Sequence, residues 1–288
     1  MIYNLGSINI DYFYSLQRLP LVGETCAADE FETGLGGKGA NMSVAIARAG
    51  GEVRHIGSIG HDAAWAQDYL TKAGVETSFV QKMDAPTGHA VIYRDAFGEN
   101  TIVIHPGANV LQDKDWISSA LANSEAGDIL LLQNETNLQD YAAALGHGSG
   151  FRVAYAAAPF DANALQAVLP YIHILILNEV ELAQLCKTSV DTPDSLDVDL
   201  VVVTKGSEGC AIYSKELGET HMPALPVTAI DTTGAGDTFT GFFLAQLDRG
   251  CSVEDAATCA NAAAALMVTR KGTADAIPSA SDVEQLLA

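Results

Sequence analysis

Short apolar runs alternate with longer helix-like stretches along most of this 288-residue chain. Such alternation is typical of parallel strands joined by crossover helices. The apolar runs occupy residues 2–8, 129–133, 152–156, 172–177 and 200–204. The helical patterns occupy residues 40–49, 64–73, 113–122, 138–145, 162–169, 179–186, 238–248, 253–269 and 282–287. We therefore expect an α/β fold, a three-layer α/β/α sandwich with a mostly parallel central sheet.

Two segments, residues 11–33 and 84–106, interrupt this alternation. Both are β-rich and have no crossover helix of their own, and the second predicts a hairpin with strands 90–94 and 101–105 around a turn at 96–100. We expect one domain, residues 1–288, from which these segments project as a small β sheet that covers a site as a lid. A plain surface hairpin is the alternative.

The edges and apolar residues of such a lid predict that it pairs with the lid of a second copy, as a homodimer. The apolar positions that support this prediction lie on both hairpin strands: Val91, Ile92, Val103 and Ile104.

The composition excludes several kinds of partner and compartment. With 48% hydrophobic residues the chain can bury a large core, and its formal net charge of −21 argues against nucleic acid or an anionic membrane as a partner. The five cysteines are odd in number and contain no C-x-x-C pair, so neither a disulfide framework nor a zinc site is indicated. No apolar run resembles a signal peptide or a membrane span, and we expect a cytoplasmic protein.

The segment Asp231-Thr-Thr-Gly-Ala-Gly-Asp237 comes directly before an apolar, helix-like run. A glycine turn at a helix start leaves backbone N–H groups unpaired at the positive end of the helix dipole, where they can hold an anion. A carboxylate at the edge of such a site suits a general base that deprotonates a nucleophile attacking the anion. An ordinary turn, with Asp237 as a helix cap, is the alternative.

A second glycine cluster, residues 34–41, matches G-x-G-x-x-G, but the polar residues before it do not resemble the buried strand of a dinucleotide site. It is not a P-loop either, because Lys38 is followed by glycine. A backbone bent close to a ligand, with Lys38 and Asn41 as donors, suits a neutral polyol. Asn9 and Asp11 add acceptors on one face after the first strand, although a plain turn after a strand is the favoured explanation of these two residues taken alone.

Four motifs together resemble those of the ribokinase-like, or PfkB, carbohydrate kinases. They are Gly6-Ser-Ile-Asn-Ile-Asp11, Gly36-Gly-Lys-Gly-Ala-Asn41, Asn178-Glu-Val-Glu181 and Asp231-Thr-Thr-Gly-Ala-Gly-Asp237, and the similarity runs to the C-terminal helix. The resemblance implies ATP-dependent phosphorylation of the primary hydroxyl of a free sugar, and it favours D-ribose, which would become ribose 5-phosphate. Fructose, 2-keto-3-deoxygluconate and a nucleoside stay open as substrates.

The resemblance also implies roles for individual residues. It makes Asp237 the general base and Gly234, Ala235 and Gly236 the anion hole. It places around the sugar Asn9, Asp11, Gly37, Lys38, Asn41 and Glu135, with Ala90, Ile92 and Ile104 covering it from the lid. It assigns four residues to the nucleotide: Asn178, Thr204, Gly206 and Asn261. It assigns Glu181 to Mg²⁺, partly through water, and Asp231 and Thr233 to a monovalent cation such as K⁺.

One segment departs from the family pattern. Residues 187–199 are too short and polar for the helix that usually precedes the strand at the nucleotide edge. Two other functions stay open beside the kinase: a dinucleotide-dependent oxidoreductase that uses the cluster at residues 34–39, and a sugar-binding protein without catalysis.

Overall fold

The computed structural model describes residues 1–95, 97, 99–188, 192–216 and 218–288. Within them a nine-stranded sheet has the order β13-β12-β11-β10-β9-β8-β1-β4-β5. Its strands are β1 (Ile2–Leu5), β4 (Val53–Gly60), β5 (Glu76–Met83), β8 (Ile129–Gln133), β9 (Arg152–Ala156), β10 (Ile174–Asn178), β11 (Leu200–Thr204), β12 (Cys210–Ser214) and β13 (Gly218–Met222). All neighbours pair in parallel except β11 with β12 and β12 with β13, so the predicted, mostly parallel sheet is confirmed.

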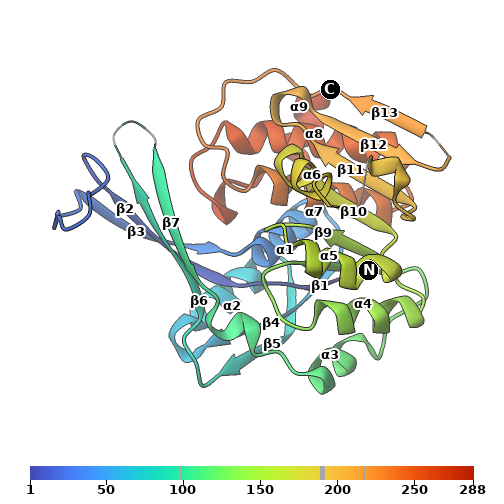
Figure 1. Cartoon of the computed structure of the whole chain (residues 1–288), viewed down its shortest axis with the longest axis horizontal. Helices are drawn as coiled ribbons and strands as arrows, with labels where there is room; N and C mark the ends of the chain where they lie inside the picture. The colour runs from blue at the N-terminus through green and yellow to red at the C-terminus, as the bar shows by residue number, and fades with distance from the viewer. Residues whose placement is uncertain (96, 98, 189–191, 217) are drawn as a thin grey trace.

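Helices cover both faces of this sheet (Figure 1). The side chains of β8 show the division, because Ile129 and Leu131 pack into one core and Leu130 and Leu132 into the other. The first core is closed by α1 (Lys38–Arg48), α2 (Ala64–Lys72), α7 (Ala235–Asp248), α8 (Val253–Val268) and α9 (Ala280–Leu287). The second is closed by α3 (Lys114–Leu121), α4 (Gln139–Gly148), α5 (Ala162–Val168) and α6 (Glu179–Leu185). The three-layer sandwich is therefore confirmed.

None of the helices in the described ranges is both long enough and apolar enough to span a membrane.

The contact between α1 and α7 depends on Gly241. A Cβ atom at this position would lie 2.4 Å from Cβ of Ala45 and 2.9 Å from the carbonyl oxygen of Met42, which is closer than real Cβ contacts. Glycine thus lets the two helices approach closely near their midpoints. This close packing brings the first turn of α1 against the first turn of α7, where the candidate site lies.

A four-stranded second sheet projects from the sandwich (Figure 1). Its order is β3-β2-β6-β7, from β3 (Glu30–Gly36), β2 (Asn9–Ser15), β6 (Gly88–Arg94) and β7 (Asn100–His105). β2 runs antiparallel to β3 and parallel to β6, while β6 and β7 form the predicted hairpin. The hairpin turn was predicted at residues 96–100, of which Ala96 and Gly98 lie outside the described residues.

The structure also differs from the sequence-based expectation at several strands. The first strand ends at Leu5 and not at residue 8, because the chain crosses into the second sheet and begins β2 at Asn9. The strands β4, β5, β12 and β13 were not predicted. Their sequences mix polar residues with apolar ones, and in β4 the polar His55 and Ser58 are fully buried. Of residues 187–199, the described part contains only the short turn Pro193–Ser195 and no α-helix, as expected.

Candidate active site

The turn before α7 presents backbone donors at the start of a helix. Gly234 adopts the left-handed conformation with φ of 75°, which favours glycine, and precedes the first helical residue, Ala235. The N–H groups of Gly236 and Asp237 have no acceptor among the described residues. They lie in the first turn of a fourteen-residue helix, where the helix dipole favours an anion. The geometry is that of an anion hole.

The carboxylate of Asp237 is held in place beside this turn. Its side chain is buried, and Oδ2 accepts a hydrogen bond of 2.9 Å from Nδ2 of Asn41 on α1. The carbonyl oxygen of the Asn41 side chain is buried and has no partner among the described groups. Asn41 therefore orients the carboxylate and keeps an acceptor free for a ligand.

Lys38 stands at the N-terminus of α1, close to several carboxylates. The negative charge of Asp237 raises the pKa of the Lys38 amino group and outweighs burial, which lowers it. Glu135 and Glu181 contribute in the same direction as Asp237. Lys38 is thus firmly cationic at neutral pH. The backbone N–H of Lys38 donates to Oε2 of Glu135 at 3.1 Å, and Ser7 Oγ donates to the same oxygen at 2.5 Å. Glu135, just after β8, is fixed by two donors.

Asp11 and Asn9 both come from β2 and lie on one face of the second sheet. Burial, followed by repulsion from Glu135 and Asp237, raises the pKa of the Asp11 carboxyl to about 7, against an opposing effect of Arg94. Oδ1 of Asn9 accepts a 2.8 Å hydrogen bond from Nδ2 of Asn109. Buried polar groups of this kind suit hydroxyls better than an apolar ligand.

Glycines allow the backbone to approach these groups closely. A Cβ atom at Gly36 would lie 2.1 Å from both carboxylate oxygens of Asp11. One at Gly37, which has φ of 90°, would lie 2.9 Å from the backbone N of Asn9. The second glycine cluster therefore lets β3 and the start of α1 surround polar side chains of β2.

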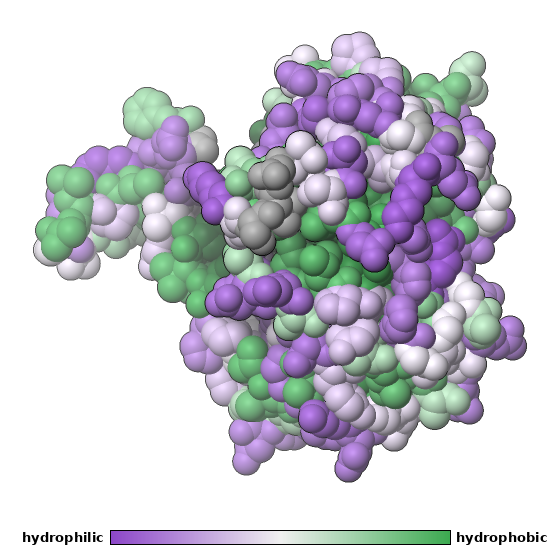
Figure 2. Space-filling view, turned by 45° about the vertical axis from the view of Figure 1, so that its right-hand side comes forward, coloured by the Kyte–Doolittle hydropathy of each residue, from purple (hydrophilic) through white to green (hydrophobic). Residues whose placement is uncertain are grey.

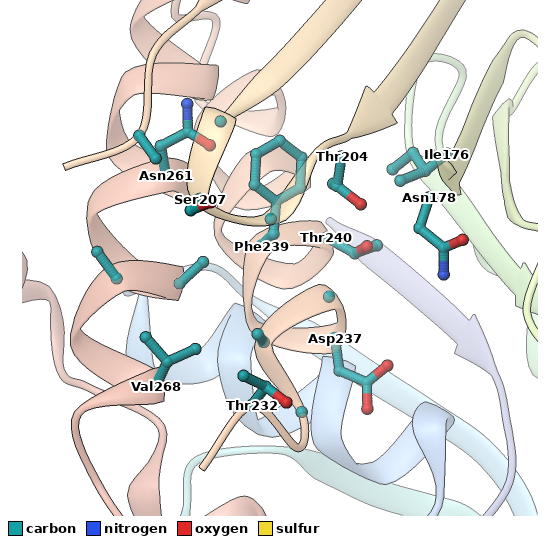
Figure 3. A pocket seen from close by; sticks show the side chains of 18 of the residues that line it. Ile176, Asn178, Thr204, Ser207, Thr232, Asp237, Phe239, Thr240, Asn261 and Val268 are labelled. Carbon is teal, nitrogen blue, oxygen red and sulfur yellow. The ribbon is translucent and has the colours of Figure 1, made fainter. Parts of the chain in front are cut away.

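A cavity of about 910 Å³ joins the Asp237 end of the site to the edge of the large sheet. It is lined by the catalytic candidates Gly234, Ala235, Gly236 and Asp237, by Lys38 and Glu181, and by the nucleotide candidates Asn178, Thr204, Gly206 and Asn261. Figure 3 shows Asp237 on α7 and Asn261 on α8 well apart in this cavity, with Thr204 and Asn178 at strand ends. Much of the remaining wall is apolar, including Leu225, Val227, Phe239 and Val268. Such a wall suits the flat face of a base at one end and phosphates at the other.

Asn178 and Glu181 form a capping box at the start of α6. The side chain of Asn178 accepts from the N–H of Glu181 at 2.9 Å, and Glu181 accepts from the N–H of Asn178 at 2.8 Å. This is the structural role that such residues have in many helices. Burial raises the pKa of Glu181, although the hydrogen bond from Asn178 and the charge of Lys38 oppose the shift. The other carboxylate oxygen of Glu181 has no hydrogen-bond partner among the described residues.

Asn261 has a structural role as well as a place in the cavity wall. Its buried amide nitrogen donates to the carbonyl oxygens of Met222 at 3.1 Å and Pro223 at 3.3 Å. These bonds hold the end of β13 and the segment after it, which forms the apolar wall.

Asp231 lies just before the anion-hole turn. Oδ1 accepts from the N–H of Thr233 at 2.9 Å, and Oδ2 lies 3.5 Å from the N–H of Gly272 and 3.6 Å from Nη2 of Arg94. Burial opposes ionisation, but these donors and the charge of Arg94 lower the pKa of the carboxyl. Asp231 is therefore ionised and already faces a cationic side chain.

The residues that were predicted to cover the sugar from a lid lie on β6 and β7. Ala90 and Ile92 are buried and pack on Phe13 of β2. Ile104 is paired with Ala90 across the hairpin, but 56% of it is exposed because β7 is the edge strand. Ile104 thus faces the same side as Ala90 without contributing to a packed cover.

Sequence reasoning missed three polar residues of the site: Ser7, Arg94 and Asn109. Ser7 stands within the Gly6–Asp11 motif and could have been found from it. Arg94 and Asn109 carry no local signal, because only the fold brings them to Asp231 and Asn9.

The chain is similar to known carbohydrate kinases along nearly its whole length. The profile described as pfkB family carbohydrate kinase matches residues 1–280. The ribokinase of Staphylococcus aureus (strain COL) is 31% identical over 98% of this chain and 98% of the relative. A deoxyribokinase of Salmonella typhi is also 31% identical, over 98% of this chain and 97% of the relative. The structure of Arabidopsis thaliana ribokinase complexed with ribose and ATP superposes with a TM-score of 0.87 at 30% identity, covering 99% of this chain and 98% of that one.

Proposed function

We propose that this chain, which belongs to the pfkB family of carbohydrate kinases, phosphorylates the primary hydroxyl of D-ribose with ATP. Family membership establishes the class of reaction, ATP-dependent phosphorylation of a sugar. Ribose is favoured because ribokinases are among the relatives that match nearly the whole chain. It is also favoured because the polar residues Asp11, Lys38, Asn41 and Glu135 lie near Asp237 or one another, with Asn9 on the same face of β2 as Asp11. The observation that carries the proposal is the Asn41–Asp237 contact at the mouth of the anion hole.

The reaction follows from this geometry. The sugar lies against β2, the start of α1 and Glu135, with its primary hydroxyl directed to Asp237. Asp237 accepts the proton of that hydroxyl as its oxygen attacks the γ-phosphoryl group of ATP. The backbone donors of the anion-hole turn stabilise the charge that develops on the transferred group, and each contributes about 3 kcal/mol. Lys38, held cationic by the surrounding carboxylates, adds a positive charge at the same place.

The nucleotide occupies the cavity between the ends of β10 and β11 and the helices α7 and α8. Its phosphates point to the anion hole, and its base rests on the apolar wall near residues 225–227. Thr204, Gly206 and Asn261 line that end of the cavity.

The residues present fit Mg²⁺. Glu181 offers a carboxylate oxygen into the cavity, and magnesium prefers carboxylate, phosphate and water ligands. No cluster of three acidic, histidine or cysteine ligands occurs among the described residues, which suits an ion held mainly by the nucleotide and water. When bound, Mg²⁺ would neutralise phosphate charge, and Asn178 would orient Glu181 toward it.

Two expectations concern assembly and compartment. The lid has exposed apolar residues on its edge strand β7, namely Ile102, Val103 and Ile104 at 50–59% exposure, and Figure 2 shows hydrophobic surface on the projecting sheet. These residues support a homodimer that pairs through the lid. All five cysteines are free, as thiols are in a reducing compartment, and this supports a cytoplasmic location.

The oxidoreductase alternative is wrong. The chain matches a kinase family, and Gly34 and Gly36 lie in β3 of the small sheet instead of between a buried strand and a helix. The sugar-binding alternative without catalysis does not explain why Asp237 stands oriented beside an anion hole.

Deoxyribose is the second candidate, because a deoxyribokinase matches the chain as extensively as the ribokinases do. The test is a screen for ADP formation from ATP over free pentoses including 2-deoxyribose, hexoses, 2-keto-3-deoxygluconate and nucleosides, with product analysis by ³¹P NMR. Ribose should give the highest kcat/KM and a 5-phosphate. A higher kcat/KM for any other substrate would replace ribose in the proposal.

A further inference from the structure

Arg94 extends from β6 of the second sheet to the loop that precedes the anion hole. Its guanidinium lies 4.2 Å from the ring centroid of Phe13, and its Nη2 lies 3.6 Å from Oδ2 of Asp231. Only 23% of the Arg94 side chain and 15% of the Asp231 side chain are exposed. Stacking on Phe13 fixes the direction of the guanidinium, so the ion pair is held from the lid side.

Asp231 connects three parts of the molecule. Its Oδ1 accepts from the N–H of Thr233 inside the anion-hole turn, and its Oδ2 lies near the N–H of Gly272 after α8. The backbone N–H groups of Ile230 and Asp231 both donate to the carbonyl oxygen of Val268, at 2.7 and 3.2 Å. The position of Asp231 therefore sets where the turn at residues 233–236 lies.

A negative charge at Asp231 is a problem for the reaction unless it is neutralised. The carboxylate is three residues before Gly234, and its field opposes phosphate binding at the same turn. The family resemblance implied a monovalent cation at Asp231 and Thr233. The residues do not fit that ion, because a guanidinium already lies 3.6 Å from Oδ2 and would repel a second cation.

We propose that Arg94 is a positioning residue that supplies the positive charge at Asp231 in place of a monovalent cation and thereby ties the lid to the anion-hole turn. Arg94 also acts on the sugar side, since its charge favours ionised Asp11. The catalytic consequence of this role rests on the proposed function. The effect of cations on ADP affinity and on the thermal midpoint can be measured without any sugar.

The test compares the wild type with Arg94→Met and Arg94→Lys in potassium chloride and in tetramethylammonium chloride at equal ionic strength. ADP affinity is measured by calorimetry, and the thermal midpoint is measured without ligand. The wild type should bind ADP equally in both salts, within about twofold, and its midpoint should not depend on the salt. Arg94→Met should bind ADP about tenfold more weakly in tetramethylammonium, and potassium should restore both affinity and midpoint. Arg94→Lys keeps the charge but loses the planar stack on Phe13, so its ADP affinity in tetramethylammonium should lie between those of the wild type and Arg94→Met.

Arg18→Met is the matched control. Like Arg94, Arg18 belongs to a segment of the predicted lid and pairs with a carboxylate, that of Glu24, but 60% of its side chain is exposed and it is not among the residues of the candidate site. It should change neither readout.

A wild type that needs potassium for ADP binding, or an Arg94→Met variant that binds ADP like the wild type in tetramethylammonium, would overturn the inference. A wild type that binds ADP in both salts but phosphorylates no sugar would refute the proposed function alone. If the wild type binds no ADP, the proposed function fails. The salt dependence of the Arg94→Met midpoint then still decides the role of Arg94.

Discussion

Replacing Asp11 with asparagine is expected to make the protein more stable at alkaline pH while weakening its substrate site. Asp11 is 6% exposed and faces Glu135 and Asp237, and its carboxyl has a pKa of about 7 in the folded chain against an ordinary value of 3.8. The folded state therefore binds a proton more tightly than the unfolded state. The free energy of unfolding must fall as the pH rises from about 4 to about 7, and the full loss is present above pH 7.

The size of this effect follows from the two pKa values. The rise from 3.8 to about 7 corresponds to on the order of 4 kcal/mol at pH 8 and roughly 2 kcal/mol at pH 5.5. The amide of the Asp11→Asn variant cannot ionise, so the stability of the variant relative to the wild type should increase by about 2 kcal/mol between these two pH values.

The measurement is urea unfolding of both proteins at about pH 5.5, 6.5, 7.5 and 8.5, followed by circular dichroism. The decisive quantity is the change with pH in the difference between the unfolding free energies of the variant and the wild type. The direct effect of the amide on packing does not depend on pH and therefore cancels. Parallel stability curves for the two proteins would refute the reasoning and would mean that Asp11 has an ordinary pKa.

For the wild type, kcat/KM for the sugar should also fall below about pH 7, since an ionised Asp11 is the better hydroxyl acceptor.

Three further predictions address the base, the glycine and the lid. Asp237→Asn should lower kcat by roughly 10²- to 10⁴-fold and leave KM for the sugar within a few-fold, and steady-state kinetics showing an unchanged kcat would disprove its role as base. Gly36→Ala should raise KM for the sugar by about tenfold or more, because its Cβ would lie 2.1 Å from the Asp11 carboxylate. Gly148→Ala is the control, since a Cβ there meets open space, and equal KM values for the two variants would count against the close approach. Light scattering should show a dimer at micromolar concentration that Val103→Lys converts to a monomer, whereas a monomeric wild type would remove the lid pairing.

The resemblance predicted many residues of the candidate site. The four motifs predicted Asn9, Asp11 and Asn41 near a sugar and Asp237 near phosphate. The structure places Asn41 against Asp237 and Asp11 within the field of Asp237, while their binding roles stay predictions. Asn9 and Asp11 were found because their signals are local: alternate positions on a strand point to one face. The glycine turn at residues 234–236 was found for the same reason, since a short motif predicts a helix start.

The sequence by itself determined the order of most strands and helices, the glycine turns and the chemical types of the groups in the site, because these depend on neighbours along the chain. Only the tertiary structure decided how those groups meet. The contact of Asn41 with Asp237 needs α1 and α7 to pack closely at Gly241, and the raised pKa of Asp11 needs Glu135 and Asp237 to lie near it. The ion pair of Arg94 with Asp231 joins a strand of the second sheet to a loop far along the chain, so no local pattern could predict it. Electrostatic fields and close packing depend on distance in space, which the order of residues does not contain.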